Sequence, residues 1–296
     1  MISERTSVGL DVHARSVVAT ALDSVTGEVF KTTLVPAHEE VIGWLRGLPG
    51  PVATTYEAGP TGFGLCRALT AAGIRCEVVA PSKITRPSGD RVKTDAKDAL
   101  LLAQLLQVGQ ITGIRVPTVS EEAARDLVRA REDIRGDLMR ARHRVSKLLL
   151  RHGHVYYGGK AWTGGHARWL HQVRFDQPGT RAAYEADLES VEFALARRDR
   201  LDAAITAMAA DSEFTPVVRK LCCLRGISTL TGFALAVEIG EWERFTGSGI
   251  GAHLGNQRLH HRWATYTARK KKHTVATTAI ARELAGWCWS LATLPD

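Results

Sequence analysis

The order of strand-like and helix-like segments in residues 8–106 restricts the fold more than any other feature of this sequence. Three apolar segments come first, and helical and apolar segments then alternate. The expected strands are residues 8–12, 16–22, 29–35, 51–56 and 77–80, and the expected helices are residues 38–46, 59–72 and 94–106. Three hairpin-linked strands followed by alternating helices and strands predict an α/β domain with a mixed sheet covered by helices.

Four carboxylates lie on the first strand, the fourth strand and the last helix of this pattern. Asp11 lies in the first strand, Glu57 at the end of the fourth, and Asp95 and Asp98 on one face of the last helix. The order of elements is that of a ribonuclease H-like sheet, in which the first and fourth strands are neighbours and the last helix packs beside them. The four groups would then converge, and Mg²⁺ would balance their charge. The alternative is that each is an ordinary turn, strand-end or surface residue.

The middle of the chain is helical. Residues 120–151 contain no proline, and an apolar stripe recurs at heptad-like spacing, although Arg131 interrupts it. The members of the stripe are Leu127, Ile134, Leu138, Ala141, Val145 and Leu148. Residues 181–208 carry a second helical pattern, and the glycine-rich residues 153–178 between them read as a long loop. We expect a long helical hairpin inserted between two domains.

Composition and charge narrow the class of protein. The formal net charge is +8, which favours a polyanionic partner. No apolar run is long enough to span a membrane, and residues 1–7 do not form a signal peptide. Five cysteines without metal-ligand spacing read as reduced thiols. These features predict a cytoplasmic, nucleoid-associated protein without a membrane partner.

The last third has two features that suit nucleic acid. Residues 224–240 form two short helical pieces joined through Gly226 and Ser228, which resembles a helix-hairpin-helix, whose turn contacts phosphate through backbone N–H groups. An ordinary helical hairpin is the alternative. Residues 256–273 contain six basic residues and no acidic one, and a solvated basic surface is the alternative there. The basic residues are Arg258, Arg262, Arg269, Lys270, Lys271 and Lys272.

These motifs together resemble the IS110 family of insertion-sequence transposases. The matching segments are residues 8–13, 56–62 and 93–99, and residues 224–240 with Phe245. The resemblance covers nearly the whole chain. It implies a RuvC-like DEDD domain in residues 1–115, a helical hairpin or coiled-coil region in residues 116–212, and a mainly α-helical C-terminal transposase domain in residues 213–296. It also implies DNA as substrate, a noncoding guide RNA, and a homo-oligomer, either a dimer or a tetramer.

By the same resemblance, Asp11, Glu57, Asp95 and Asp98 are the catalytic, Mg²⁺-binding tetrad. The sequence departs from the family in one place. Family members carry a nucleophilic serine shortly after an Ala-x-Leu-Gly pattern, whereas here residues 252–255 lead directly into a segment that normally follows much later. Ser248 precedes the pattern and is no replacement, so the C-terminal domain reads as internally deleted.

Three functions are therefore weighed. The first is a DNA transposase or recombinase acting through the DEDD site. The second is a catalytically incomplete transposase remnant that only binds DNA or RNA. The third is an ATPase of the sugar-kinase and actin class, which shares the opening strands. That class places Gly and Ser or Thr after the first Asp to hold phosphate, whereas Val12 and His13 follow Asp11 here.

Overall fold

The protein is described by a computed structural model for residues 4–84, 94–242, 255–269 and 272–293. The chain divides into two compact units, Met1–Thr118 and Val119–Asp296. None of the helices in the described part of the chain has the length and apolar character needed to cross a membrane.

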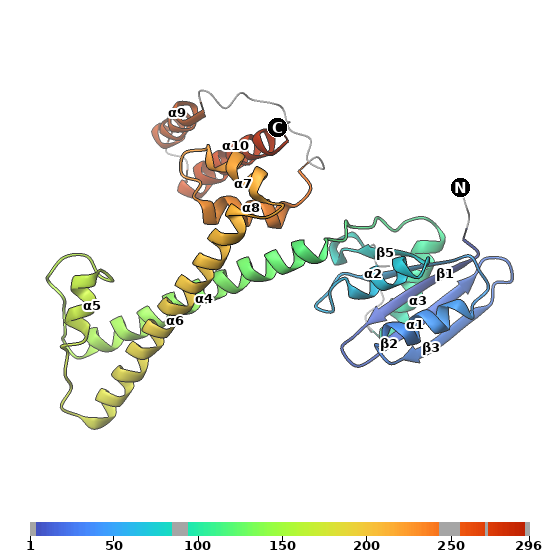
Figure 1. The fold of residues 1–296 in the computed structure, drawn as a ribbon, viewed down its shortest axis with the longest axis horizontal. Coiled ribbons are helices and arrows are strands. Elements are labelled where there is room, and N and C mark those ends of the chain that lie inside the picture. The colour runs from blue at the N-terminus through green and yellow to red at the C-terminus, as the bar shows by residue number, and fades with distance from the viewer. Residues whose placement is uncertain (1–3, 85–93, 243–254, 270–271, 294–296) are drawn as a thin grey trace. The chain divides into compact units, whose positions relative to one another are not determined.

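The first unit is built on a mixed five-stranded sheet (Figure 1). Its strands are β1 (Thr6–Val12), β2 (Val17–Asp23), β3 (Val29–Leu34), β4 (Val52–Glu57) and β5 (Arg75–Val79). They lie in the order β3-β2-β1-β4-β5, with the first three antiparallel and β1, β4 and β5 parallel. The predicted mixed sheet and the predicted neighbourhood of the first and fourth strands are thus confirmed.

Helices cover both faces of this sheet. On one face, α1 (His38–Arg46) and α2 (Gly64–Ala71) bury apolar side chains against alternate residues of β1 and β2. On the other face lies α3 (Asp95–Gln107), which buries Ala99, Leu102 and Ala103. The prediction that the second helix begins at Gly59 is wrong, because residues 58–63 form a loop and α2 starts at Gly64.

An ion pair between Arg5 and the buried carboxylate of Asp23 stabilises the start of the first unit. The side chain of Asp23 is 1% exposed, and Arg5 donates to it from Nε at 3.1 Å and from Nη2 at 2.7 Å. Asp23 also accepts the N–H of Val25 at 2.8 Å, which shapes the turn after β2. The hydrogen bonds from Arg5 hold the pKa of Asp23 well below its usual range, although burial opposes them.

Acid should therefore weaken this unit. A carboxyl whose pKa is lower when folded stabilises the fold above its unfolded pKa of about 3.9, and loses that effect as the pH falls further. We expect urea unfolding followed by circular dichroism to show Arg5→Gln less stable than the native chain at pH 6, with a smaller difference at pH 3. The exposed Lys31→Gln serves as control. An equal difference at both pH values would contradict the assignment.

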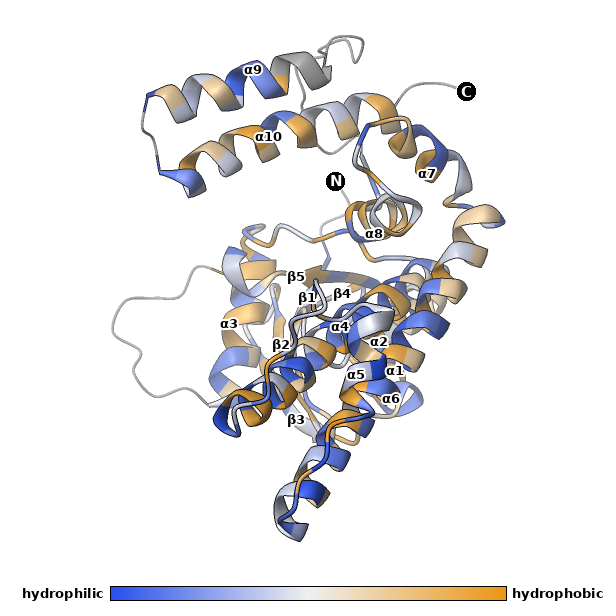
Figure 2. Cartoon of the chain, turned by 90° about the vertical axis from the view of Figure 1, so that its left-hand side faces the viewer, coloured by the Kyte–Doolittle hydropathy of each residue, from blue (hydrophilic) through white to orange (hydrophobic). Residues whose placement is uncertain are grey.

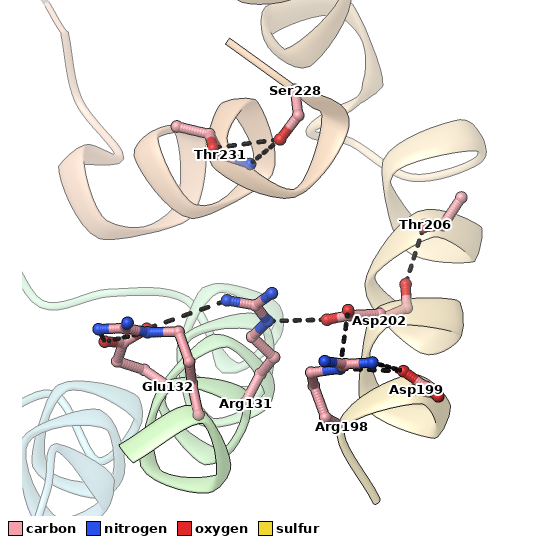
Figure 3. Close-up of polar contacts among 9 residues, drawn as sticks. Arg131, Glu132, Arg198, Asp199, Asp202, Thr206, Ser228 and Thr231 are labelled. Atoms are coloured by element: carbon pink, nitrogen blue, oxygen red, sulfur yellow. Dashed lines mark hydrogen bonds and ion pairs between the residues drawn. The ribbon is translucent and has the colours of Figure 1, made fainter. Parts of the chain in front are cut away.

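The second unit begins with two long helices of 33 residues each, α4 (Val119–Arg151) and α6 (Pro178–Ala210). The two helices are antiparallel. The ion pairs between them show this, since Arg131 pairs with Asp202 at 2.7 Å and the later Arg144 pairs with the earlier Asp187 at 3.0 Å. Arg131 is tolerated within the apolar stripe because its guanidinium pairs with the carboxylate of Asp202. Asp202 also lies near Arg198 (Figure 3). The rest of the predicted stripe is buried or partly buried in the hairpin core.

The residues between the two long helices are more ordered than predicted. The expectation of a long loop is wrong for Gly164–Leu170, which form α5. Leu170, Val173 and Phe175 are buried against α4 and α6, and the Tyr184 hydroxyl donates to the Leu170 carbonyl at 2.8 Å. Apolar burial outweighs the glycines here and folds the segment onto the helix ends.

Four further helices lie in the part of the second unit that the structure describes. They are α7 (Thr215–Cys222), α8 (Thr229–Ile239), α9 (Gly255–Ala268) and α10 (His273–Ala292). Of the predicted pieces in residues 224–240, only the second is a helix, because α7 already ends at Cys222. Figure 2 shows α9 and α10 side by side, with α10 the more hydrophobic of the two. Trp287 and Cys288 of α10 are buried against Leu221 and Trp242.

Candidate functional site

The alternation of side chains along β1 determines which residues can meet α3. Val8 and Leu10 point into the core with α1 and α2, so Gly9 and Asp11 face the opposite side, where α3 lies. A Cβ atom at Gly9 would lie 2.0 Å from the carbonyl oxygen of Ala99 and 2.6 Å from the backbone nitrogen of Ala103. The helix therefore lies directly on the strand at this glycine.

This close contact places the first turn of α3 above the end of β1. Asp95 lies one turn before Ala99, and one ligand atom each from Asp11, His13 and Asp95 lie within 4.8 Å of one another. The His13 Nε2 atom lies 3.2 Å from Oδ2 of Asp11 and 3.7 Å from Oδ2 of Asp95. Asp11 is 18% exposed, whereas His13 and Asp95 are at least half exposed.

The charges in this group are partly unfavourable. Burial raises the pKa of Asp11, the neighbouring His13 lowers it, and the carboxylates of Asp95 and Asp98 raise it again. Carboxyl groups from two elements are thus held near one another at a partly buried strand end. A divalent cation would offset this repulsion.

Glu57 and Asp98 lie near the group without being part of it. Leu10 is the register partner of Tyr56 in the parallel pair β1–β4, so Asp11 and Glu57 are the next residues at the same end of the sheet. Glu57 is half-buried and pairs in register with Val79 of β5. Asp98 is half-buried on α3, close enough to influence Asp11. The three ligand atoms that meet come from Asp11, His13 and Asp95.

From the sequence alone, His13 reads most simply as a surface histidine. Its side chain nevertheless contacts both Asp11 and Asp95. The only sequence signal is its position two residues after Asp11, because residues two apart on a strand point to the same side. The order of the elements predicted the role of Asp11, and the alternation of side chains along the strand points to His13.

The donor set suits a divalent cation. Two carboxylate oxygens are the ligands preferred by Mg²⁺, and an imidazole nitrogen is more common at Mn²⁺ or Zn²⁺. Asp11, Asp95 and His13 could supply three ligands, and their exposed side would leave positions open to a substrate. The chemistry of these groups thus fits a catalytic metal centre better than a closed structural one.

A pocket of about 240 Å³ adjoins His13. It is lined by His38 of α1 and by Thr61 and Gly62 of the loop before α2, together with apolar side chains of β1 and β2. Gly62 has a φ of 70°, a conformation that glycine adopts without strain. The glycine-rich loop, which reads from sequence as the start of a helix, therefore forms a wall of the pocket that reaches His13.

The candidate nucleic-acid residues of the C-terminal region have different surroundings. Gly226 has a φ of 92° in the connection between α7 and α8, and Ser228 caps α8 by accepting the N–H of Thr231 at 3.4 Å (Figure 3). Arg262 of α9 is paired with the buried carboxylate of Glu283 on α10, so it joins the two helices.

Of the remaining basic candidates, the structure describes Arg269 and Lys272. Arg269 and Arg262 line a pocket of about 380 Å³ with Tyr266. Lys272 is exposed at the start of α10. Lys270, Lys271, Phe245, Ser248, residues 252–254 and the side chain of Arg258 lie outside the described residues.

Comparison with known proteins points to one family. The profile of the IS110 DEDD family, described as a transposase, matches residues 8–153. A protein of Sinorhizobium fredii that carries the transposase name y4qE is 31% identical over 355 aligned positions, which cover 96% of this chain and 88% of that protein. The transposase for insertion sequence element IS1533 of Leptospira borgpetersenii is 31% identical over 243 positions, which cover 80% of this chain and 70% of that protein.

Proposed function

Because the chain belongs to the IS110 family of insertion-sequence transposases, we propose that it acts on DNA phosphodiester bonds through Asp11, Glu57, Asp95 and Asp98. The observation that carries this proposal is the meeting of Asp11 from β1 with Asp95 from α3. Two elements far apart in sequence bring carboxylates together at the end of a sheet. A purely structural surface has no need of such an arrangement.

The proposed site holds a divalent cation, Mg²⁺ in the simplest case. When bound, such an ion polarises a phosphate oxygen and stabilises the charge that develops on attacking and leaving oxygens. Asp11 and Asp95 would hold it, with Glu57 and Asp98 beside them. Without the ion, His13 keeps Asp11 and Asp95 near one another through its contacts with both carboxylates, and it could supply the third ligand.

The domain assignment is part of the same proposal. A RuvC-like, ribonuclease H-like domain in residues 1–115 is supported by the strand order β3-β2-β1-β4-β5. The hairpin of residues 116–212 is supported by the packing of α4 on α6, and the transposase domain of residues 213–296 by its helical character. A guide RNA and a homo-oligomer of two or four chains follow from the family resemblance.

A catalytically incomplete remnant is the alternative, and one observation favours it. The alignment with y4qE runs over 355 positions, whereas 96% of the 296 residues of this chain is about 284. About 70 aligned positions of that relative therefore have no counterpart here. Gaps of this total length leave room for the missing serine segment.

Nicking and strand transfer on DNA carrying the ends of the element test the proposal. The purified chain is compared in Mg²⁺ and in EDTA, with binding to the same DNA measured in parallel. We expect nicking that depends on Mg²⁺. Binding without nicking in Mg²⁺ or Mn²⁺ would contradict the catalytic proposal and support the remnant that only binds.

A further inference from the structure

The positive charge of the chain is concentrated where α4 and α6 are joined. Residues 138–175 contain eight Lys or Arg, five of the eleven histidines and no acidic residue. The net charge of this segment, with histidine neutral, equals the +8 of the whole chain. We call the segment from Lys147 to Phe175 the hairpin tip; it comprises the end of α4, the connection and α5 (Figure 1).

Four of the five tip cations are exposed and have neither an ion pair nor a side-chain hydrogen bond in the described part of the chain. They are Lys147, Arg151, Lys160 and Arg168, whereas Arg174 donates to the carbonyls of His171 and Val173. The arginines nearer the middle of α4 behave differently, since Arg140 pairs with Asp137 and Arg144 with Asp187. Several arginines along the long helices thus face carboxylates, whereas the tip contains no carboxylate side chain.

Aromatic rings hold the tip in a defined shape. His166 is 6% exposed, and its ring contacts those of Tyr156, Trp162 and Trp169 at centroid distances of 4.9, 5.1 and 5.4 Å. Burial lowers the pKa of His166, so this ring is neutral and serves packing. Arg142 of α4 lies over the Trp162 ring at 5.0 Å, which joins the connection to the helix.

One aromatic side chain stands outside this cluster. Tyr157 is 90% exposed, next to the buried cluster and between Arg151 and Lys160 in sequence. An exposed aromatic ring flanked by cations is the arrangement by which proteins stack unpaired bases while contacting the backbone phosphates. A duplex offers its phosphates but not the faces of its bases.

From this juxtaposition we propose that the hairpin tip binds a single-stranded or looped segment of nucleic acid, with Arg151, Lys160 and Arg168 contacting phosphates and Tyr157 stacking on a base. This goes beyond the proposed function, because it concerns α4, α5 and their connection and requires neither the carboxylates nor a metal. A nonspecific polyanion surface would need the cations alone. The role of Tyr157 therefore separates the two.

The test is fluorescence anisotropy of the full chain in EDTA, with labelled single strands of RNA and DNA of about 16 nucleotides and the matching duplex. The tip variant is Arg151→Gln/Lys160→Gln/Arg168→Gln. The control variant, Lys31→Gln/Arg46→Gln/Arg200→Gln, removes three exposed cations elsewhere. EDTA suppresses nicking, so the result is independent of the proposed catalytic function.

We expect the tip variant to bind single strands roughly tenfold more weakly, and its salt dependence to fall by about two in slope. Tyr157→Ala should weaken single-strand binding by about fivefold or more while leaving the duplex unchanged. Thermal melting should be unchanged in all variants, because the replaced side chains are exposed. Equal losses in tip and control variants would overturn the proposal, and so would unchanged single-strand affinity of Tyr157→Ala.

Discussion

Asp11→Asn is expected to lower Mg²⁺-dependent nicking by roughly a hundredfold to a thousandfold without lowering the thermal stability of the protein. The amide keeps the shape of the side chain but supplies a weaker, neutral ligand. Removing one negative charge from a partly buried group that also contains Asp95 relieves repulsion in the metal-free fold. Loss of activity and retention of stability together distinguish a catalytic carboxylate from a structural one.

The matched control is Glu28→Gln, which removes an exposed carboxylate from the turn before β3. It should nick DNA at the native rate. If Asp11→Asn melted several degrees lower than the native chain, Asp11 would be stabilising the fold, and the metal site proposed here would lose its main ligand.

Gly9→Ala is expected to destabilise the protein by about 3 kcal/mol or more. The added Cβ would lie 2.0 Å from the Ala99 carbonyl oxygen and 2.8 Å from the Leu102 Cβ, so the helix itself has to move. Any fold that survives should bind Mn²⁺ more weakly, because Asp95 would be displaced from Asp11. Calorimetric melting and Mn²⁺ titration measure the two effects.

Gly43→Ala is the control, and it is expected to raise the stability of the protein rather than lower it. Gly43 is an exposed residue within α1, and no atom lies within 4 Å of the position of an added Cβ. Alanine should stabilise the protein there by roughly 0.5–1 kcal/mol, because it restricts the unfolded chain and favours the helix. Native stability of Gly9→Ala would show that α3 does not rest on β1 as described.

Much of the first unit was predictable because its elements follow local rules. The strand and helix periods located β1 to β5 to within a few residues, and the element order predicted that β1 and β4 are neighbours. The convergence of Asp11 and Asp95 follows from that order. The grouping of His13 with them was missed, because a position two residues after Asp11 is a weak signal for a single histidine.

The parts that were not predictable depend on contacts between distant residues. Arg131 disturbs the apolar stripe of α4, and only Asp202, on a different helix, explains why it is tolerated there. The glycines of residues 153–178 indicate a loop, yet burial of Leu170 and Phe175 produces α5. Local composition does not contain information about such partners.

The length of α4 determines how far the proposed nucleic-acid contact at the hairpin tip lies from the start of the helix. Thirty-three residues at about 1.5 Å each extend roughly 50 Å, and a duplex advances about 3.4 Å per base pair. If the start of α4 also contacts nucleic acid, the two contacts are separated by the length of about one and a half turns of duplex. Shortening α4 and α6 together by two turns would reduce that interval by about three base pairs, a change that footprinting could resolve.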